Sequence, residues 1–114
     1  MTRSPKALPT ASLHIVLALL DGELHGYALM RRVEEHSDGA VRMGPGTLYG
    51  TLNRLVTDGL IVDTTVRNAR TEGERRRYYE LTTTGRAVAI EELARLQTLV
   101  ERVTGHHLSG GATA

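Results

Sequence analysis

The stretch from Val41 to Ile61 constrains the fold more than any other part of the chain. Pro45 suits the first position of a helix, where its missing N–H costs nothing, and Gly59 suits a left-handed helix exit. At 100° per residue the apolar side chains of this stretch share one face. They are Leu48, Leu52, Leu55 and Val56. The stretch therefore predicts an amphipathic helix that packs on a core through these four residues.

The opposite face of this helix carries no acidic side chain and is small near its N-terminal end. Its members are Gly46, Thr47, Gly50, Asn53, Arg54 and Thr57, with Tyr49 on the flank. Such a face can lie against a nucleic-acid duplex without charge repulsion, and helix N-termini offer N–H groups to phosphate. The alternative is an ordinary surface helix, but those usually carry Glu and Lys pairs. The face favours nucleic-acid contact.

A β-hairpin with a basic tip is predicted next. Two β-branched or aromatic runs, residues 60–66 and 76–81, flank a segment that contains Gly73. Between positions 67 and 77, five arginines stand against two glutamates, a net charge of +3. The arginines are Arg67, Arg70, Arg75, Arg76 and Arg77. This cluster favours a polyanionic partner, and the alternative is a solvated, arginine-rich turn.

Two earlier helices are expected before this unit. Residues 10–20 place Leu13, Val16, Leu17 and Leu20 on one face, while Ile15 and Leu19 fall off it, so this helix is apolar on more than one side. A second helix opens at His25-Gly26-Tyr27 and ends at Ser37-Asp38-Gly39. We interpret His25 as a helix-entry residue rather than a metal ligand, because no second ligand stands three or four positions later. Two arginines oppose five acids in residues 21–41, a net charge of −3.

Helices followed at once by a basic hairpin indicate a winged helix, so the fold class is mainly α with a small β-hairpin. In that arrangement the third helix enters the major groove of DNA, and the hairpin arginines reach the backbone or the minor groove.

A last helix should start at Thr82-Thr83-Thr84-Gly85, run to about Thr104 and end at Gly105. A heptad-like seam lies along it, formed by Ala89, Leu93, Leu96, Val100 and Val103. A compact winged helix offers this seam no obvious cover. We therefore expect a homodimer, in which the seam packs on its mate and on Ile15 and Leu19 of the first helix. The alternative is a helix that folds back on its own domain.

Composition bounds the remaining possibilities. With 114 residues and no cysteine, the chain forms one compact unit without disulfides or Cys-ligated zinc. We expect flexible tails at 1–9 and 106–114, a winged-helix domain at 10–81 and a dimerisation helix at 82–105. The longest apolar run, Ile15–Leu20, is too short for a membrane span, which predicts a cytoplasmic protein. No histidine has a nucleophile or carboxylate at a motif spacing, so we expect no enzyme activity, no metal and no cofactor.

Several ordered motifs between about residues 10 and 104 resemble the PadR family of bacterial transcriptional regulators. These motifs are Leu13-His14-Ile15-Val16-Leu17-Ala18-Leu19-Leu20, His25-Gly26-Tyr27, Gly44-Pro45-Gly46-Thr47-Leu48-Tyr49, Asp58-Gly59-Leu60-Ile61, Arg77-Tyr78-Tyr79-Glu80-Leu81-Thr82 and Gly85-Arg86. The resemblance implies a winged-helix repressor of the short form, which dimerises through a single C-terminal helix. In many members a small molecule releases the DNA. Two positions depart from the family pattern, Gly44 before the proline and Gly50 within the third helix.

The resemblance also implies residue roles. The family's recognition-helix residues correspond to Thr47, Tyr49, Asn53 and Arg54, and its basic wing residues to Arg75, Arg76 and Arg77. A dimer would place its recognition helices about 34 Å apart on a pseudo-palindromic duplex. Asn53 and Arg54 would then read base edges, whereas Thr47, Tyr49 and the wing arginines would hold phosphate.

A small-molecule effector would bind at the dimer interface, against residues that a plain dimer core would also use. These are Ile15, Leu19, Leu93, Leu96 and Val100. The alternative function is a winged-helix protein-interaction module without autonomous DNA binding, in which the acidic second helix meets a basic partner.

Overall fold

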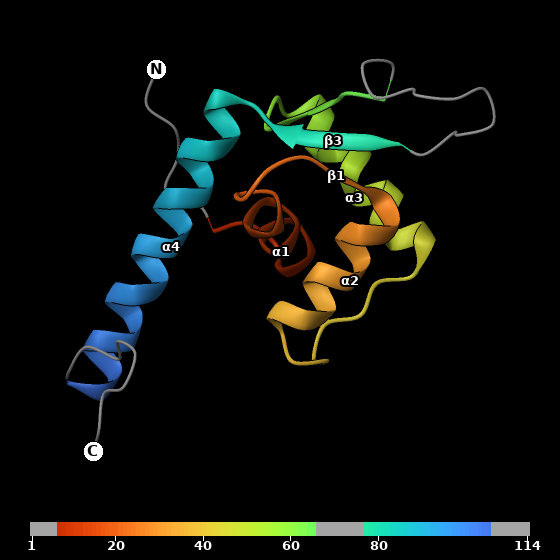
Figure 1. Cartoon of the computed structure of the whole chain (residues 1–114). Helices are drawn as coiled ribbons and strands as arrows, with labels where there is room; N and C mark the ends of the chain where they lie inside the picture. The colour runs from red at the N-terminus through yellow and green to blue at the C-terminus, as the bar shows by residue number, and fades with distance from the viewer. Residues whose placement is uncertain (1–6, 66–76, 106–114) are drawn as a thin grey trace.

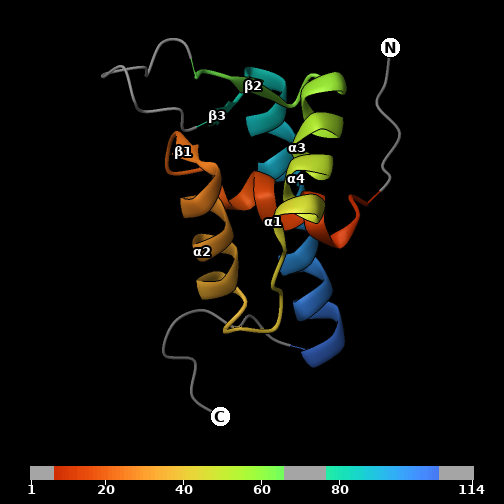
Figure 2. The same cartoon turned by 90° about the vertical axis from the view of Figure 1, so that its right-hand side faces the viewer.

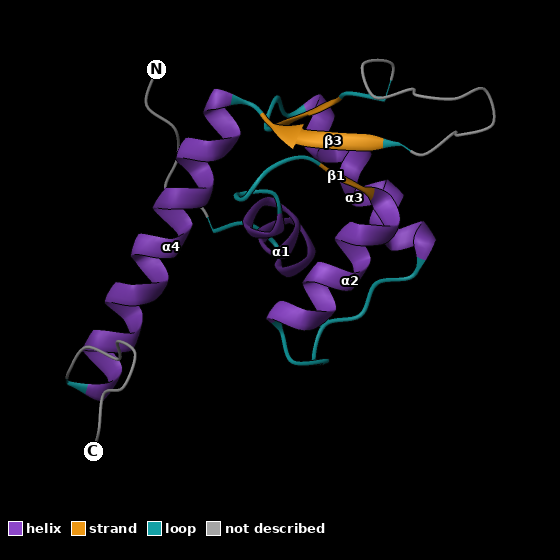
Figure 3. Cartoon of the chain, viewed as in Figure 1, coloured by secondary structure: helices purple, strands orange, loops and turns teal. Residues whose placement is uncertain are grey.

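The computed structural model describes residues 7–65 and 77–105. Its elements follow in the order α1 (Thr10–Ala18), β1 (Leu24–His25), α2 (Gly26–His36), α3 (Pro45–Thr57), β2 (Ile61–Asp63), β3 (Tyr78–Leu81) and α4 (Thr83–Thr104). Helices make up most of the fold, and the short strands lie together at one end of it (Figure 3). The predicted fold class is confirmed.

The described strands form a three-stranded antiparallel sheet in the order β1-β3-β2. In β2, Ile61 pairs with Leu81 and Asp63 pairs with Tyr79. Sequence reasoning expected the hairpin of β2 and β3 but missed β1, in which Leu24 pairs with Tyr79. Two residues are too few to show a period, so β1 exists only because it pairs with β3.

Helix α1 lies at the centre of the fold, where it contacts α2, α3 and α4 (Figures 1 and 2). Its fully buried apolar residues are Ile15, Val16 and Ala18, followed by Leu19 just beyond the helix. The predicted face was therefore wrong in part, since Leu13, Leu17 and Leu20 are only half-buried. Three neighbouring helices cover more than one side of α1, and a single-face pattern cannot describe that.

Helix α3 follows the sequence prediction closely at both ends. Pro45 is its first residue, and Gly59 adopts a φ of 78° just after it. Leu48, Leu52 and Leu55 are buried as predicted. Val56, predicted on the same face, is instead 40% exposed, because it lies at the edge of the stripe, beyond the cover of the neighbouring elements.

Helix α4 begins and ends where the sequence indicated. The Thr82 side chain accepts a hydrogen bond from the Gly85 N–H at 2.9 Å and donates one to the Gly59 carbonyl at 2.7 Å. Gly85 packs against the backbone of Leu60, the residue directly before β2. A Cβ at Gly85 would lie 1.8 Å from the Leu60 carbonyl oxygen. Gly105 ends the helix with a φ of 80°.

The far end of α4 extends away from the rest of the fold (Figure 1). Val88, Ala89 and Glu92 are buried, whereas the apolar residues that follow are largely exposed. Across the described part of the chain, no helix combines the length and apolar character that crossing a membrane requires.

Candidate nucleic-acid interface

The outer face of α3 is exposed. Its exposed members are Gly46, Thr47, Gly50, Asn53, Arg54 and Thr57. An added Cβ at Gly46 or Gly50 would meet no atom within 4 Å, so these glycines fill no tight packing site. Their effect is to keep the N-terminal half of the face flat. A flat face lets a helix backbone approach a surface closely.

The predicted residues of α3 line two separate grooves, one on each flank of the helix. A hollow of about 270 Å³ separates α3 from the start of α1 and includes Thr47 and Arg54. A second hollow of about 260 Å³ lies on the other flank, between Tyr49, Asn53 and Arg77. The face therefore has an α1 side and a wing side, and the two candidate base-reading residues, Arg54 and Asn53, line different grooves.

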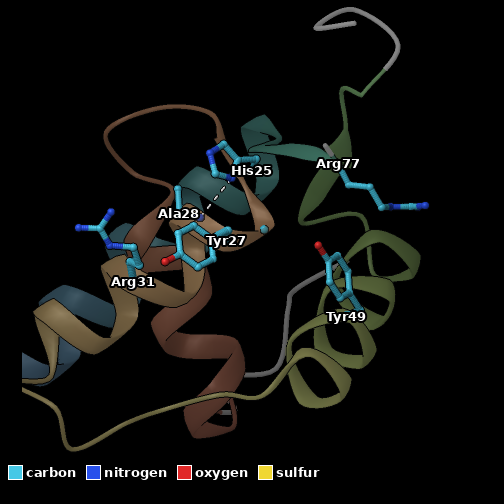
Figure 4. A pocket seen from close by; sticks show the side chains of 7 residues that line it. His25, Tyr27, Ala28, Arg31, Tyr49 and Arg77 are labelled. Carbon is cyan, nitrogen blue, oxygen red and sulfur yellow. Dashed lines mark hydrogen bonds between the residues drawn. The ribbon is translucent and has the colours of Figure 1, made fainter. Parts of the chain in front are cut away.

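A larger cavity than these two, about 590 Å³, joins the wing side of α3 to the start of α2 (Figure 4). It is lined by His25, Gly26, Tyr27, Ala28, Arg31, Tyr49 and Arg77. Sequence reasoning missed Tyr27 and Arg31 of α2. Tyr27 is 63% exposed. The sequence signal that could have identified it is an aromatic residue directly after His25-Gly26.

Gly26 brings α2 and α3 together in this cavity. A Cβ at Gly26 would lie 2.3 Å from the Tyr49 hydroxyl oxygen, so a larger residue here would force the Tyr49 side chain to shift. The Gly26 N–H donates to the Arg77 carbonyl at 3.1 Å, which ties the start of α2 to the base of the wing. The contact fixes Tyr49 on the wing side of α3.

His25 has the structural role predicted for it. Its Nδ1 accepts a hydrogen bond from the Ala28 N–H at 3.2 Å, which caps α2. Its ring meets the Tyr78 ring edge-on, with centroids 5.5 Å apart. Within the described residues, no three His, Asp or Glu side chains are grouped in a way that could hold a metal ion.

Arg77 is held by two partners at the base of the wing. Its Nε donates to the Tyr79 hydroxyl at 3.1 Å, and its Nη2 donates to Asp63 Oδ2 at 3.2 Å. The hydrogen bond to Tyr79 and the charge of Asp63 raise the pKa of Arg77. Partial burial raises the pKa of Asp63, but the bonds from Thr65 and Arg77 outweigh it and keep that pKa below its ordinary value of 3.8. The other predicted wing arginines, Arg67, Arg70, Arg75 and Arg76, lie outside the described residues.

The acidic stretch before α3 has a different electrostatic character. Glu34 pairs with Arg42 at 3.1 Å, and Asp21 lies 3.7 Å from Arg32. Glu35 lies 3.9 Å from Arg31 on the same helix. Arginines therefore neutralise several of these acids locally, in contrast to α3, which carries no acid.

The predicted dimerisation residues divide into two groups. Ile15, Leu19 and Ala89 are buried in the core of the single chain, so they present no surface to a second copy. The remaining members lie on the far part of α4: Leu93, Leu96 and Val103 are exposed and Val100 is half-buried. Ile90 and Leu99 add exposed apolar surface beside them.

One polar residue interrupts the buried side of α4. Glu92 is 1% exposed, and Arg95 donates a hydrogen bond to its Oε1. Its Oε2 has no hydrogen-bond partner among the described residues. Sequence reasoning missed this burial, because a glutamate next to the seam is typical of a solvated helix face.

Comparison with known proteins supports a regulatory role. Residues 16–91 match the family model described as "Transcriptional regulator PadR-like family". Transcriptional regulator Rv3488 of Mycobacterium tuberculosis is 38% identical over 103 residues, which span 89% of this chain and 91% of that protein.

Solved structures agree with this match. A PadR family transcription regulator from Clostridium difficile superposes with a TM-score of 0.68 at 26% identity, over 85% of this chain and 96% of that one. A PadR-like transcription factor from Bacteroides fragilis gives a TM-score of 0.69 at 28% identity, over 84% and 88% of the two chains.

Proposed function

The chain belongs to the PadR-like family of transcriptional regulators, which bind DNA and are not enzymes. We propose that it is a homodimeric repressor of a pseudo-palindromic operator. One observation carries the proposal: the exposed face of α3 has no acid and is bordered on its wing side by Arg77. A polyanion can approach such a face without repulsion.

The proposed contacts follow from the two flanks of α3. Arg54 and Asn53 contact base edges, where arginine favours guanine and asparagine favours adenine. Gly46 permits close approach of the helix backbone. Thr47 and Tyr49 hold phosphate, which positions the helix without reading sequence. We assign the same phosphate-holding role to the predicted wing arginines, which are Arg67, Arg70, Arg75, Arg76 and Arg77.

The homodimer is supported by the far part of α4. Leu93, Leu96 and Val103 expose apolar side chains in one region, with Val100 half-buried among them. Exposed apolar surface of this kind marks an interaction site. A second copy packed there would bring two α3 helices to major grooves about 34 Å apart. Ile15, Leu19 and Ala89 do not enter this surface, because the chain's own core already covers them.

We further propose that a small-molecule effector at the dimer interface releases the DNA. Of the predicted lining residues, Ile15 and Leu19 are buried in the core, so a pocket at the interface would use Leu93, Leu96 and Val100. Such a ligand regulates only if it binds the free and DNA-bound states with different affinity.

Selection of bound duplexes from a random pool at physiological salt tests the proposed function. We expect a two-fold motif with half-sites about one helical turn apart. A folded, dimeric protein that enriches no motif would contradict it and would favour the protein-interaction module. Sedimentation equilibrium of the same sample distinguishes failure to dimerise from failure to bind.

A further inference from the structure

We infer that Tyr79 and Asp63 are positioning residues that fix the Arg77 guanidinium, so that its outer edge meets a DNA phosphate at the junction of the wing and α3. The inference deepens the proposed function and rests on it. It concerns residues that all lie within the described part of the chain.

The two hydrogen bonds use one edge of the guanidinium. Arginine carries five N–H donors in a planar fork, and its Nε and Nη2 share the side edge. Nε donates to Tyr79 and Nη2 donates to Asp63. The outer edge, formed by Nη1 and the second N–H of Nη2, meets no other described residue in a hydrogen bond. Two parallel donors on that edge match two phosphate oxygens.

The sheet register explains why these three residues meet. Asp63 of β2 pairs directly with Tyr79 of β3, so their side chains lie on the same face of the sheet. Arg77 precedes Tyr79 by two positions and shares that face, because side chains alternate along an extended chain. The arrangement follows from strand pairing rather than from a chance surface contact.

Both partners are themselves held in place. The Tyr79 ring is 1% exposed, so the core fixes where its hydroxyl lies. The Asp63 carboxylate accepts from the Thr65 N–H at 2.8 Å and from the Thr65 hydroxyl. The Thr65 hydroxyl oxygen in turn accepts from the Tyr78 N–H at 3.1 Å, which anchors this turn to β3.

The held arginine points toward the proposed DNA-binding surface. It lines the hollow shared with Tyr49 and Asn53, and its side chain extends outward above Tyr49 (Figure 4). Arg77 belongs to the wing and not to the helix that enters the groove, so the backbone beside the groove is its nearest target. A fixed arginine loses less rotamer freedom on binding than a mobile one.

Tyr79→Phe tests the inference, because it removes the hydroxyl and keeps the buried ring. We expect affinity for every duplex to fall about three- to tenfold, the effect of one lost hydrogen bond. The salt dependence should move toward that of Arg77→Ala. Tyr78→Phe is the matched control, since the Tyr78 hydroxyl does not contact Arg77, and it should bind as the parent protein does.

A double-mutant cycle separates positioning from a general effect on the core. If Tyr79 acts through Arg77, adding Tyr79→Phe to Arg77→Ala should cause no further loss. An equal loss in both backgrounds would overturn the positioning role. Loss confined to one base position of the selected site would overturn the phosphate assignment in favour of base reading.

Two neutral variants isolate the hydrogen bond of Asp63 from its charge. Asp63→Asn keeps an acceptor oxygen and Asp63→Ala does not. The asparagine variant should therefore bind duplexes more tightly than the alanine variant. Equal affinity would show that Asp63 does not position Arg77.

The NMR resonance of the Arg77 Nε–H in the free protein reads the positioning without DNA. It should shift in Tyr79→Phe and stay unchanged in Tyr78→Phe. If the parent protein binds no duplex, the proposed function and the phosphate contact both fail, whereas the resonance still decides whether Arg77 is held.

Discussion

Helices α3 and α4 both carry an apolar stripe, but the fold covers the two stripes to different extents. On α3 the stripe is buried at Leu48, Leu52 and Leu55, and apart from Val56 at its edge the face left outside carries no large apolar residue and no acid. On α4 the cover stops after Glu92, and the face left outside is apolar. The uncovered side of a helix indicates the chemistry of its partner. Here α3 suits a polyanion and α4 suits another apolar surface.

Disturbing the attachment of α4 to the domain should have the largest effect on stability. Gly85→Ala places a Cβ against the backbone carbonyl of Leu60, so we expect a loss of about 3 kcal/mol in the free energy of unfolding. Gly50→Ala in α3 is the matched control, because its Cβ meets nothing within 4 Å. It should be neutral or raise stability by up to about 1 kcal/mol. Equal effects in urea unfolding would show that α4 is not closely packed at Gly85.

The apolar end of α4 is tested by placing a charge on it. Leu93→Asp should weaken dimerisation by at least about 2 kcal/mol per subunit, since an unpaired carboxylate would enter the interface. Light scattering should then report one chain of 12.5 kDa in place of two, with an unchanged helical spectrum. Val56→Asp on α3 is the control: Val56 is 40% exposed and Leu93 44%, so exposure alone does not distinguish them. A dimer that persists in Leu93→Asp would place the interface elsewhere.

The polar face of α3 is tested by removing its exposed arginine. Arg54→Ala should weaken binding by about 1 to 3 kcal/mol and relax one position of the selected site. Arg102→Ala on the exposed part of α4 should leave both affinity and sequence preference unchanged. Repeating the duplex selection with each variant measures this. An unaltered preference in Arg54→Ala would remove Arg54 from the base-reading residues.

The smallest effect concerns acid stability at the edge of the α3 surface. The pKa of Asp63 lies below its ordinary value of 3.8, so its ionised form stabilises the fold above about pH 4. That contribution is lost as the pH falls through the lowered pKa. Above pH 4 the free energy of unfolding of the parent protein should exceed that of Asp63→Asn by at most about 1 kcal/mol. Below pH 4 this difference should shrink. A difference that is constant down to pH 2 would contradict the pairing with Arg77.

Sequence reasoning succeeded where the signal is local. The starts and ends of α2, α3 and α4 depend on residues within a turn of the boundary, among them His25, Pro45, Gly59 and Thr82. Capping and left-handed exits are short-range interactions, so a single sequence specifies them. Side chains alternate along a strand, which places Tyr78 and Tyr79 on opposite faces of β3, and the structure decides that Tyr79 packs inward.

Sequence reasoning was incomplete where several elements meet. It assigned Ile15 and Leu19 to a second copy, whereas α2, α3 and α4 enclose α1 and leave these side chains in the chain's own core. It placed Val56 inside, and it gave no sign that Glu92 is buried. A periodic pattern reports which face of a helix is apolar, but it cannot report how many neighbours cover that face.

The sequence by itself determined the winged-helix fold class, the family, the boundaries of α2, α3 and α4 and the acid-free face of α3. These follow from local residue chemistry and from the order of motifs along the chain. Only the tertiary structure decided that Arg77 meets Asp63 and Tyr79, that Tyr49 lies against Gly26, and that the two flanks of α3 form separate grooves. Strand register and helix packing bring those residues together, and both depend on contacts between segments far apart in the sequence.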